Sequence, residues 1–244
     1  MGNTKVILGR EFAAYFSTPI AYVFIVIFLA SSGTFAFFLG NFFGRGQADM
    51  HAFFTYAPWL YLFFAPAVAM RLWAEEKKTG TIELIMTLPV STVEVVLSKF
   101  LAAWAFIGVA LALTFPLWIS VNYLGDPDNG VIFAGYVGTF FMAGGFLAIG
   151  SCISALTNNQ VIAFIVSALV CFLFLTSGLP LVLNFFQGWA PDFIVDTISA
   201  MSFLTHFSSI TKGIIDLRDV VFFGSLIGLA LFINTIIVDA KKGA

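Results

Sequence analysis

Charged side chains are scarce in this sequence of 244 residues, in which Asp, Glu, Lys and Arg together make up only 10%. Soluble domains carry about 25% charged residues and about 45–50% apolar ones, whereas 60% of this chain is hydrophobic. A larger core cannot account for that difference, so we expect a lipid bilayer to be the solvent for most of the chain. No basic patch interleaved with aromatic residues occurs, and no nucleic-acid partner is expected.

The residues of common catalytic and metal sites are missing or isolated. No Gly is followed by Lys, which excludes a phosphate-binding loop, and neither a nucleophile elbow nor a His-Glu-x-x-His motif occurs. His51 and His206 are far apart in the sequence, so we expect a surface or interfacial role for both and no metal site. Cys152 and Cys171 fall within apolar runs and are expected to be small buried hydrophobes. We therefore expect no enzymatic activity and no cofactor on this chain.

Long apolar runs are what the sequence has in abundance. A helix needs about 20 apolar residues to cross ~30 Å of hydrocarbon, and other spanning structures would leave backbone groups unpaired in lipid. Six runs qualify, at residues 19–43, 54–73, 95–124, 131–156, 161–183 and 220–238. The sequence thus predicts an all-α membrane protein with six transmembrane helices, forming a single domain over residues 1–244.

Basic residues set the orientation, because cytoplasmic loops carry an excess of Lys and Arg. With the N-terminus inside, eight basic residues lie on the cytosolic side and three outside. The inside set is Lys5, Arg10, Arg71, Lys77, Lys78, Lys99, Lys241 and Lys242, and the outside set is Arg45, Lys212 and Arg218. We therefore expect both termini in the cytosol.

Three segments outside the spans have patterns of their own. In residues 1–18, Leu8, Phe12, Tyr15 and Phe16 form one helical stripe, which predicts an interfacial helix before the first span. Ser91 and Glu94 have the spacing of a capping box at the start of the third span. The external segment 184–219 holds two short helical patterns, at 192–201 and 203–215, which either dip into the membrane or pack as a lid over the spans.

Acidic and basic residues are absent from the middle of every predicted span, whereas ion-coupled carriers usually need such groups. Arg71 and Lys99 lie near the cytosolic span ends, where their side chains can extend to the membrane surface. If this chain moves a substrate, we expect the energy to come from another subunit.

The densest charge cluster lies in residues 74–90, between the second and third spans. Ile82, Ile85 and Met86 share one apolar face there, and acidic and basic residues precede them. This pattern fits either an interfacial connector helix or a helix that docks onto a soluble partner.

Residues 75–91 read EEKKTGTIELIMTLPVS, and with Glu94 and Lys99 they resemble the signature of type-2 ABC transporter permeases. They are especially similar to the branch that contains the gliding-motility-associated permeases. Two later stretches, SFLTHF at 202–207 and KGIIDLRD at 212–219, resemble the same branch just before its last span. The six-span layout with an interfacial helix also agrees, so the resemblance covers essentially the whole chain.

The resemblance implies a permease of the bacterial cytoplasmic membrane, driven by a separate cytosolic ABC ATPase that binds ATP and Mg²⁺. Residues 74–90 would form the coupling helix that docks in a cleft of that ATPase, with Gly80 permitting the bend at its start. The docking residues would be Glu75, Glu76, Lys77, Lys78, Gly80, Thr81, Glu83 and Ile85. A second, smaller cytosolic contact would be made by Thr157, Asn158, Asn159 and Gln160.

Several partners and alternatives stay open at the level of sequence. Such permeases work as dimers, so a second copy or a paralogue is expected, besides membrane lipids and an auxiliary periplasmic or membrane subunit. The main hypothesis is an exporter subunit. The alternatives are a stand-alone secondary carrier or channel and the membrane scaffold of an ABC-powered assembly machine.

Overall fold

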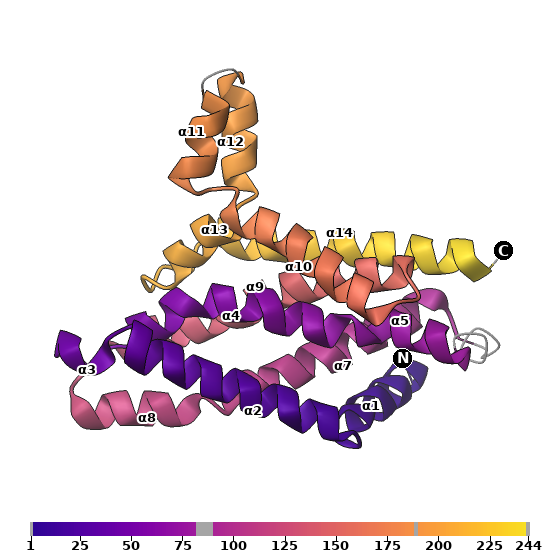
Figure 1. Cartoon of the computed structure of the whole chain (residues 1–244), viewed down its shortest axis with the longest axis horizontal. Helices are drawn as coiled ribbons and strands as arrows, with labels where there is room; N and C mark the ends of the chain where they lie inside the picture. Colours follow the sequence, from indigo (N-terminus) through magenta and orange to yellow (C-terminus); the bar gives the residue numbers. More distant parts are fainter. Residues whose placement is uncertain (1, 82–89, 188–189, 243–244) are drawn as a thin grey trace.

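The computed structural model describes residues 2–81, 90–187 and 190–242, and all regular structure in these residues is helical (Figure 1). The helices are α1 (Gly2–Phe16), α2 (Pro19–Thr34), the π-helix η1 (Phe35–Leu39), α3 (Phe42–Arg45), α4 (His51–Ala69), α5 (Arg71–Thr79), α7 (Thr92–Ala112), α8 (Phe115–Leu124), α9 (Asn129–Leu156), α10 (Gln160–Thr176), α11 (Pro180–Gln187), α12 (Asp192–Ala200), α13 (Phe203–Ile210) and α14 (Leu217–Lys242).

Five helical stretches are long and apolar enough to cross a membrane. They are Pro19–Arg45, His51–Thr79, Thr92–Leu124, Asn129–Leu156 and Leu217–Ala240. Two bent pairs could add to them: α10 with α11, bent by 76°, and α12 with α13, bent by 56°. The prediction of an all-α membrane protein is confirmed, with five to seven candidate spans in the described residues.

The predicted fifth span, residues 161–183, is not one straight helix. Helix α10 ends at Thr176, and Pro180 starts α11 in a new direction. Between them, Gly178 lies so close to α13 that an added Cβ would come within 2.6 Å of the Ser202 Cβ. The bend therefore exists because a residue without a side chain permits close contact with α13, and because proline is well suited to the first turn of a new helix.

Helix α9 lies at the centre of the bundle, where it contacts α4, α5, α7, α10, α13 and α14. Small residues allow these close approaches: a Cβ added at Gly150 would lie 2.5 Å from the Cβ of Ala69 on α4. Trp104 of α7 stacks on Phe140 of α9 with ring centroids 4.5 Å apart, and its indole N–H donates to the Phe140 carbonyl at 2.9 Å. The core is thus built around α9, because six other helices pack against it.

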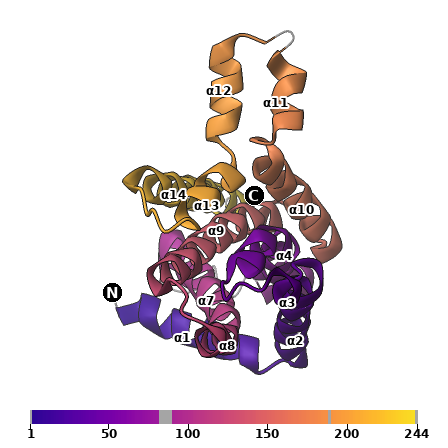
Figure 2. The same ribbon diagram turned by 90° about the vertical axis from the view of Figure 1, so that its left-hand side faces the viewer.

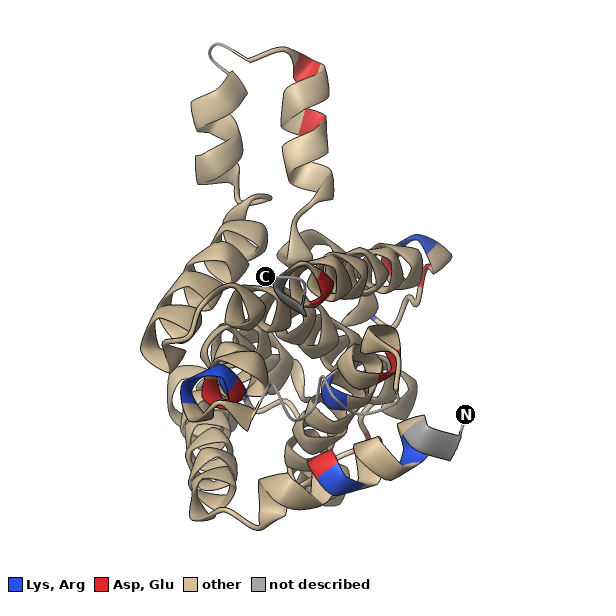
Figure 3. Cartoon of the chain, turned by 90° about the vertical axis from the view of Figure 1, so that its right-hand side faces the viewer, with Lys and Arg blue, Asp and Glu red and all other residues tan. Residues whose placement is uncertain are grey.

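The two ends of the bundle differ. Helices α1 and α5 and the C-terminal part of α14 lie at one end, here called the terminal end, while α3 and α8 lie at the opposite end (Figure 1). A view onto the terminal end shows charged residues gathered there on several helices (Figure 3). The helix predicted before the first span is present as α1 and packs along α7, where Tyr15 stacks on Phe106 at 4.9 Å.

Helices α11 and α12 form a hairpin that projects sideways from the bundle (Figures 1 and 2). No residue of α11 is buried, and in α12 only Val195 is. The two helices predicted in the external segment are present as α12 and α13, although α13 ends at Ile210. A surface or interfacial role was expected for His206, but it does not lie at the surface: it is 4% exposed, and its ring nitrogens lie within hydrogen-bond distance of Asp219 and of the Ala200 carbonyl.

Candidate functional site

The candidate site lies at the terminal end, where α5 continues the second span out of the bundle. The single residue Met70 separates α4 from α5, and Ser154 of α9 forms hydrogen bonds with the backbone at this point. The Ser154 hydroxyl accepts hydrogen bonds from the N–H groups of Trp73 and Ala74, both at 3.1 Å, and donates to the Met70 carbonyl at 3.1 Å. The first N–H groups of a helix have no partner within it, so α9 supplies the partner that α5 needs there.

A second tie joins α5 to the end of α9. The Lys77 ammonium donates to the carbonyl of Ala155, near the C-terminal end of α9. Directly beyond lies the loop over residues 157–160, in which Asn159 caps α10 by accepting from the Val161 N–H at 2.9 Å. The two segments predicted to contact a partner, far apart in the sequence, therefore meet at one end of the molecule.

Lys99 of α7 is the centre of a buried charge network. Its side chain is 3% exposed, and its ammonium contacts Glu11 of α1 at 3.0 Å and also Glu76 of α5. The Trp73 ring lies 5.6 Å from the same nitrogen. The expectation that Lys99 extends toward the membrane surface is not met, because two carboxylates and an indole face provide its partners inside the protein.

The acids of this network are themselves partly buried. The Glu11 and Glu76 side chains are 16% and 17% exposed. Burial raises the pKa of Glu11, but Lys99 and Arg10 outweigh that effect, so the pKa lies below the ordinary value of 4.5. Among the described residues, Glu76 Oε2 has no hydrogen-bond partner and is buried. The Lys99 ammonium is therefore the main group that compensates both carboxylates.

A cavity of about 670 Å³ opens beside this network. Its lining includes Glu11, Tyr15, Thr18, Arg71, Glu75 and Lys99, from α1, α5 and α7 and the connection between α1 and α2. Arg71 and Glu75 pair one turn apart on α5, with the Arg71 Nε at 2.7 Å from Glu75 Oε2. The cavity thus marks a polar joint between the interfacial helix and the extension of the second span.

The predicted docking residues divide into three groups. Glu75, Glu76 and Lys77 make their contacts within the chain, as described above. Lys78, Gly80 and Thr81 are exposed at the end of α5, and Gly80 has a left-handed backbone with φ 73° that ends this helix. Glu83 and Ile85 lie outside the described residues, as do the apolar positions Ile82 and Met86.

Four loop residues were predicted as the second contact. Asn158 and Asn159 are exposed, whereas Thr157 and Gln160 are half-buried. Thr157 Oγ1 accepts from the Asn159 N–H at 3.1 Å, so the loop has its own internal hydrogen bond. Asn158 is the side chain of this loop that the fold leaves most open to a partner.

Sequence reasoning missed the roles of Glu11, Lys99 and Ser154. A signal for Lys99 was present, because a basic residue five positions inside a predicted span requires a partner. Nothing in the sequence identifies Glu11 as that partner, since 88 positions separate the two residues.

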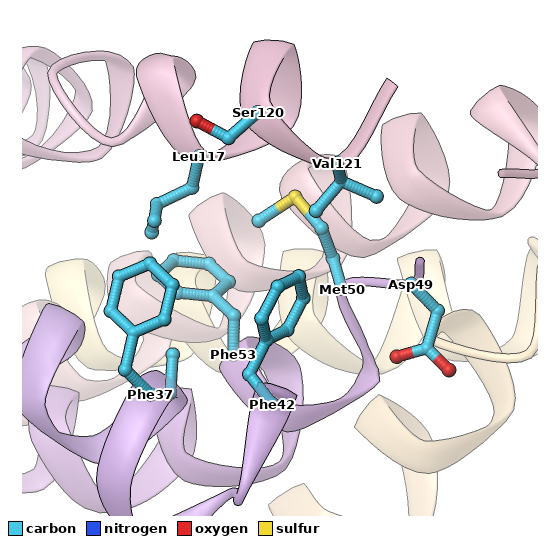
Figure 4. A pocket seen from close by; sticks show the side chains of 9 residues that line it. Phe37, Phe42, Asp49, Met50, Phe53, Leu117, Ser120 and Val121 are labelled. Atoms are coloured by element: carbon cyan, nitrogen blue, oxygen red, sulfur yellow. The ribbon is translucent and has the colours of Figure 1, made fainter. Parts of the chain in front are cut away.

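A small apolar pocket lies at the opposite end, between η1, the start of α4 and α8 (Figure 4). Aromatic and aliphatic side chains surround it, among them Phe37, Phe42, Met50 and Leu117 (Figure 4). Its one ionised group, Asp49, is paired with Arg45 at 3.1 Å. Such a lining fits packing and offers no catalytic chemistry.

Comparison with protein-family models gives a match over most of the chain. The model of a family described as "ABC-2 family transporter protein" matches residues 20–220, from the start of α2 into α14. A search of curated proteins found no match. The matched region includes α5, α7 and the loop at residues 157–160, and with them most of the candidate site.

Proposed function

Because the chain belongs to the ABC-2 transporter family, we propose that it is the permease subunit of an ATP-driven exporter, coupled to a separate cytosolic ATPase through residues 74–90. The observation that carries this proposal is the attachment of α5. The segment that leads into the predicted coupling helix is bonded to α9 through Ser154 and Lys77, and to α1 and α7 through Lys99.

The attachments of α5 suggest how movement would pass through the permease. A displacement of α5 would act on α4 directly, on α9 through two hydrogen-bonded contacts, and on α1 and α7 through one ammonium. ATP binding to the partner can bias the permease only if the partner's two states contact α5 differently. We propose that the partner's two states differ in their contacts with the exposed end of α5, at Lys78, Gly80 and Thr81.

The distribution of basic residues supports an orientation with the terminal end in the cytosol of a bacterial cell. The cytosolic ATPase would then approach α5 and the loop at residues 157–160 from the same side. We further propose that two permease copies, or this chain and a paralogue, form the pathway, because one chain offers a single small bundle to the lipid.

Charge reversal at Glu83 tests the coupling. The chain would be expressed together with the cytosolic ATPase that co-purifies with it, and ATP hydrolysis would be measured in vesicles. We expect Glu83→Arg to abolish the permease-dependent part of hydrolysis while membrane insertion is unchanged. Asp126→Arg, which reverses an exposed acid at the opposite end, is the matched control and should behave as the unmodified chain does.

Three results would contradict the proposal. Normal permease-dependent hydrolysis in Glu83→Arg would remove the coupling role of residues 74–90. Transport by the purified chain in vesicles without nucleotide would instead indicate a stand-alone carrier or channel. ATP-dependent complex assembly without transport would indicate the scaffold function.

A further inference from the structure

His206 and Asp219 form a buried pair at the opposite end of the molecule from the candidate site. Both side chains belong to residues that are 4% exposed, one on α13 and the other in the first turn of α14. His206 Nδ1 lies 2.6 Å from Asp219 Oδ1, and Nε2 lies 3.0 Å from the carbonyl oxygen of Ala200. The imidazole also stacks on Phe222 at 4.0 Å. One ring thus connects the end of α12, α13 and α14.

The partners of the ring fix how many protons the pair holds. A backbone carbonyl can only accept, so Nε2 must carry a hydrogen. Nδ1 faces a carboxylate oxygen, and a neutral ring would then place two lone pairs against each other at 2.6 Å. The contact is favourable only with a further proton between Nδ1 and Asp219. The pair therefore holds two protons, and a distance this short is typical of charge-assisted hydrogen bonds.

The surroundings show what loss of that proton would do. Asp196 of α12, with Asp216 and Arg218 at the start of α14, lines a cavity of about 800 Å³ together with the pair. Helices α9 and α10 also pack on α13 but contain no Asp, Glu, Lys, Arg or His. With both protons the pair is neutral overall. After losing one it would carry a buried negative charge, near two further carboxylates and one guanidinium.

We propose that His206 and Asp219 are a proton-binding site that holds α13 and the base of the α11–α12 hairpin against α14. Asp219 lies near the N-terminus of α14, which favours the ionised carboxylate. The shared proton therefore lies on the ring of His206, as an imidazolium. Removal of the proton leaves the ring with one N–H for two acceptors, so either the bond to Asp219 on α14 or the bond to the Ala200 carbonyl is lost. The attachment of the α12–α13 segment to α14 is then weakened. This site is independent of the coupling to an ATPase.

The chain offers a direct spectroscopic test, because it contains two histidines. His51→Gln leaves His206 as the single histidine, and ¹⁵N-histidine spectra of this variant in nanodiscs report the protons on each ring nitrogen. From the two contacts of the ring we expect two protons shared by the ring and Asp219, with Nδ1 hydrogen-bonded. Adding Asp219→Asn should leave the ring with one proton. A single ring proton in His51→Gln with Asp219 ionised, or an unchanged spectrum on adding Asp219→Asn, would overturn the proposal.

Hydrogen exchange tests the structural consequence. After correction for intrinsic rates, we expect the amides of α13 to exchange about tenfold faster in Asp219→Leu, which can neither donate to nor accept from the ring, than in the unmodified chain, whereas α7 should be unaffected. His51→Gln is the matched control and should exchange as the unmodified chain does. Equal α13 exchange in Asp219→Leu and in the unmodified chain would refute the attachment role.

Discussion

Replacing Lys99 by Met removes one charge from the buried network and keeps a side chain of similar length. Glu11 and Glu76 then lose the ammonium they share, with only 16% and 17% of their side chains exposed. Removing one partner of a buried ion pair costs about 3–5 kcal/mol. Because both acids retain some contact with water, we expect the lower end, about 3 kcal/mol. For a chain of this size, that loss lowers Tm by about 6–12 °C.

Thermal unfolding of the purified protein in nanodiscs, followed by tryptophan fluorescence, measures this effect. Lys78→Met is the matched control, because it also removes one positive charge at the terminal end, but from an exposed position on α5. Its Tm should stay within about 2 °C of the unmodified protein, as is usual for a surface substitution.

A compensated variant separates charge from packing. Combining Lys99→Met with Glu11→Gln and Glu76→Gln removes both carboxylates that lost the ammonium, of which, within the described part of the chain, only Glu11 keeps a partner, Arg10 at 2.8 Å. Most of the lost stability should therefore return. If Lys99→Met has the same Tm as the unmodified protein, or if the triple variant is as unstable as Lys99→Met, the Lys99 ammonium does not join α1, α5 and α7 as described.

Three further predictions concern the same region. The lowered pKa of Glu11 contributes stability that is present above its ordinary value of 4.5 and is lost as the pH falls through the folded-state value; Glu11→Gln should therefore flatten the dependence of Tm on pH in this acid range. Ser154→Ala leaves the N–H groups of Trp73 and Ala74 without their partner, and we expect a loss of about 1–3 kcal/mol in denaturant unfolding. Gly80→Ala forces a side chain onto a left-handed backbone, which costs about 1 kcal/mol and should lower permease-dependent ATP hydrolysis more than Thr81→Ala does.

The sequence predicts the unbroken spans well, because an apolar run of sufficient length has one stable form in lipid. The bend after α10 was not predicted, because it depends on the contact of Gly178 with α13, some 24 positions later in the chain. Hydropathy counts the residues around Gly178 as apolar or neutral, so the run appears continuous.

The candidate site was predicted in position but not in its internal contacts. Glu75 and Glu76 lie in a charged run, and such runs usually face water. The structure turns Glu76 inward, because Lys99 pairs with it from α7, 23 positions later in the sequence. For the same reason the pairing of His206 with Asp219 could not be inferred, since a helix end and a loop separate the two residues.

The single-residue interruption at Met70 has a mechanical consequence. Within an uninterrupted helix, bending stiffness is set by the helix's own hydrogen bonds, whereas here a hydroxyl on α9 also bonds to Met70 at the joint and to two N–H groups of α5. A change in the angle between α4 and α5 would therefore break these hydrogen bonds or move α9 as well. A force applied to α5 would therefore also act on α9, at the centre of the bundle, and would not only bend the joint.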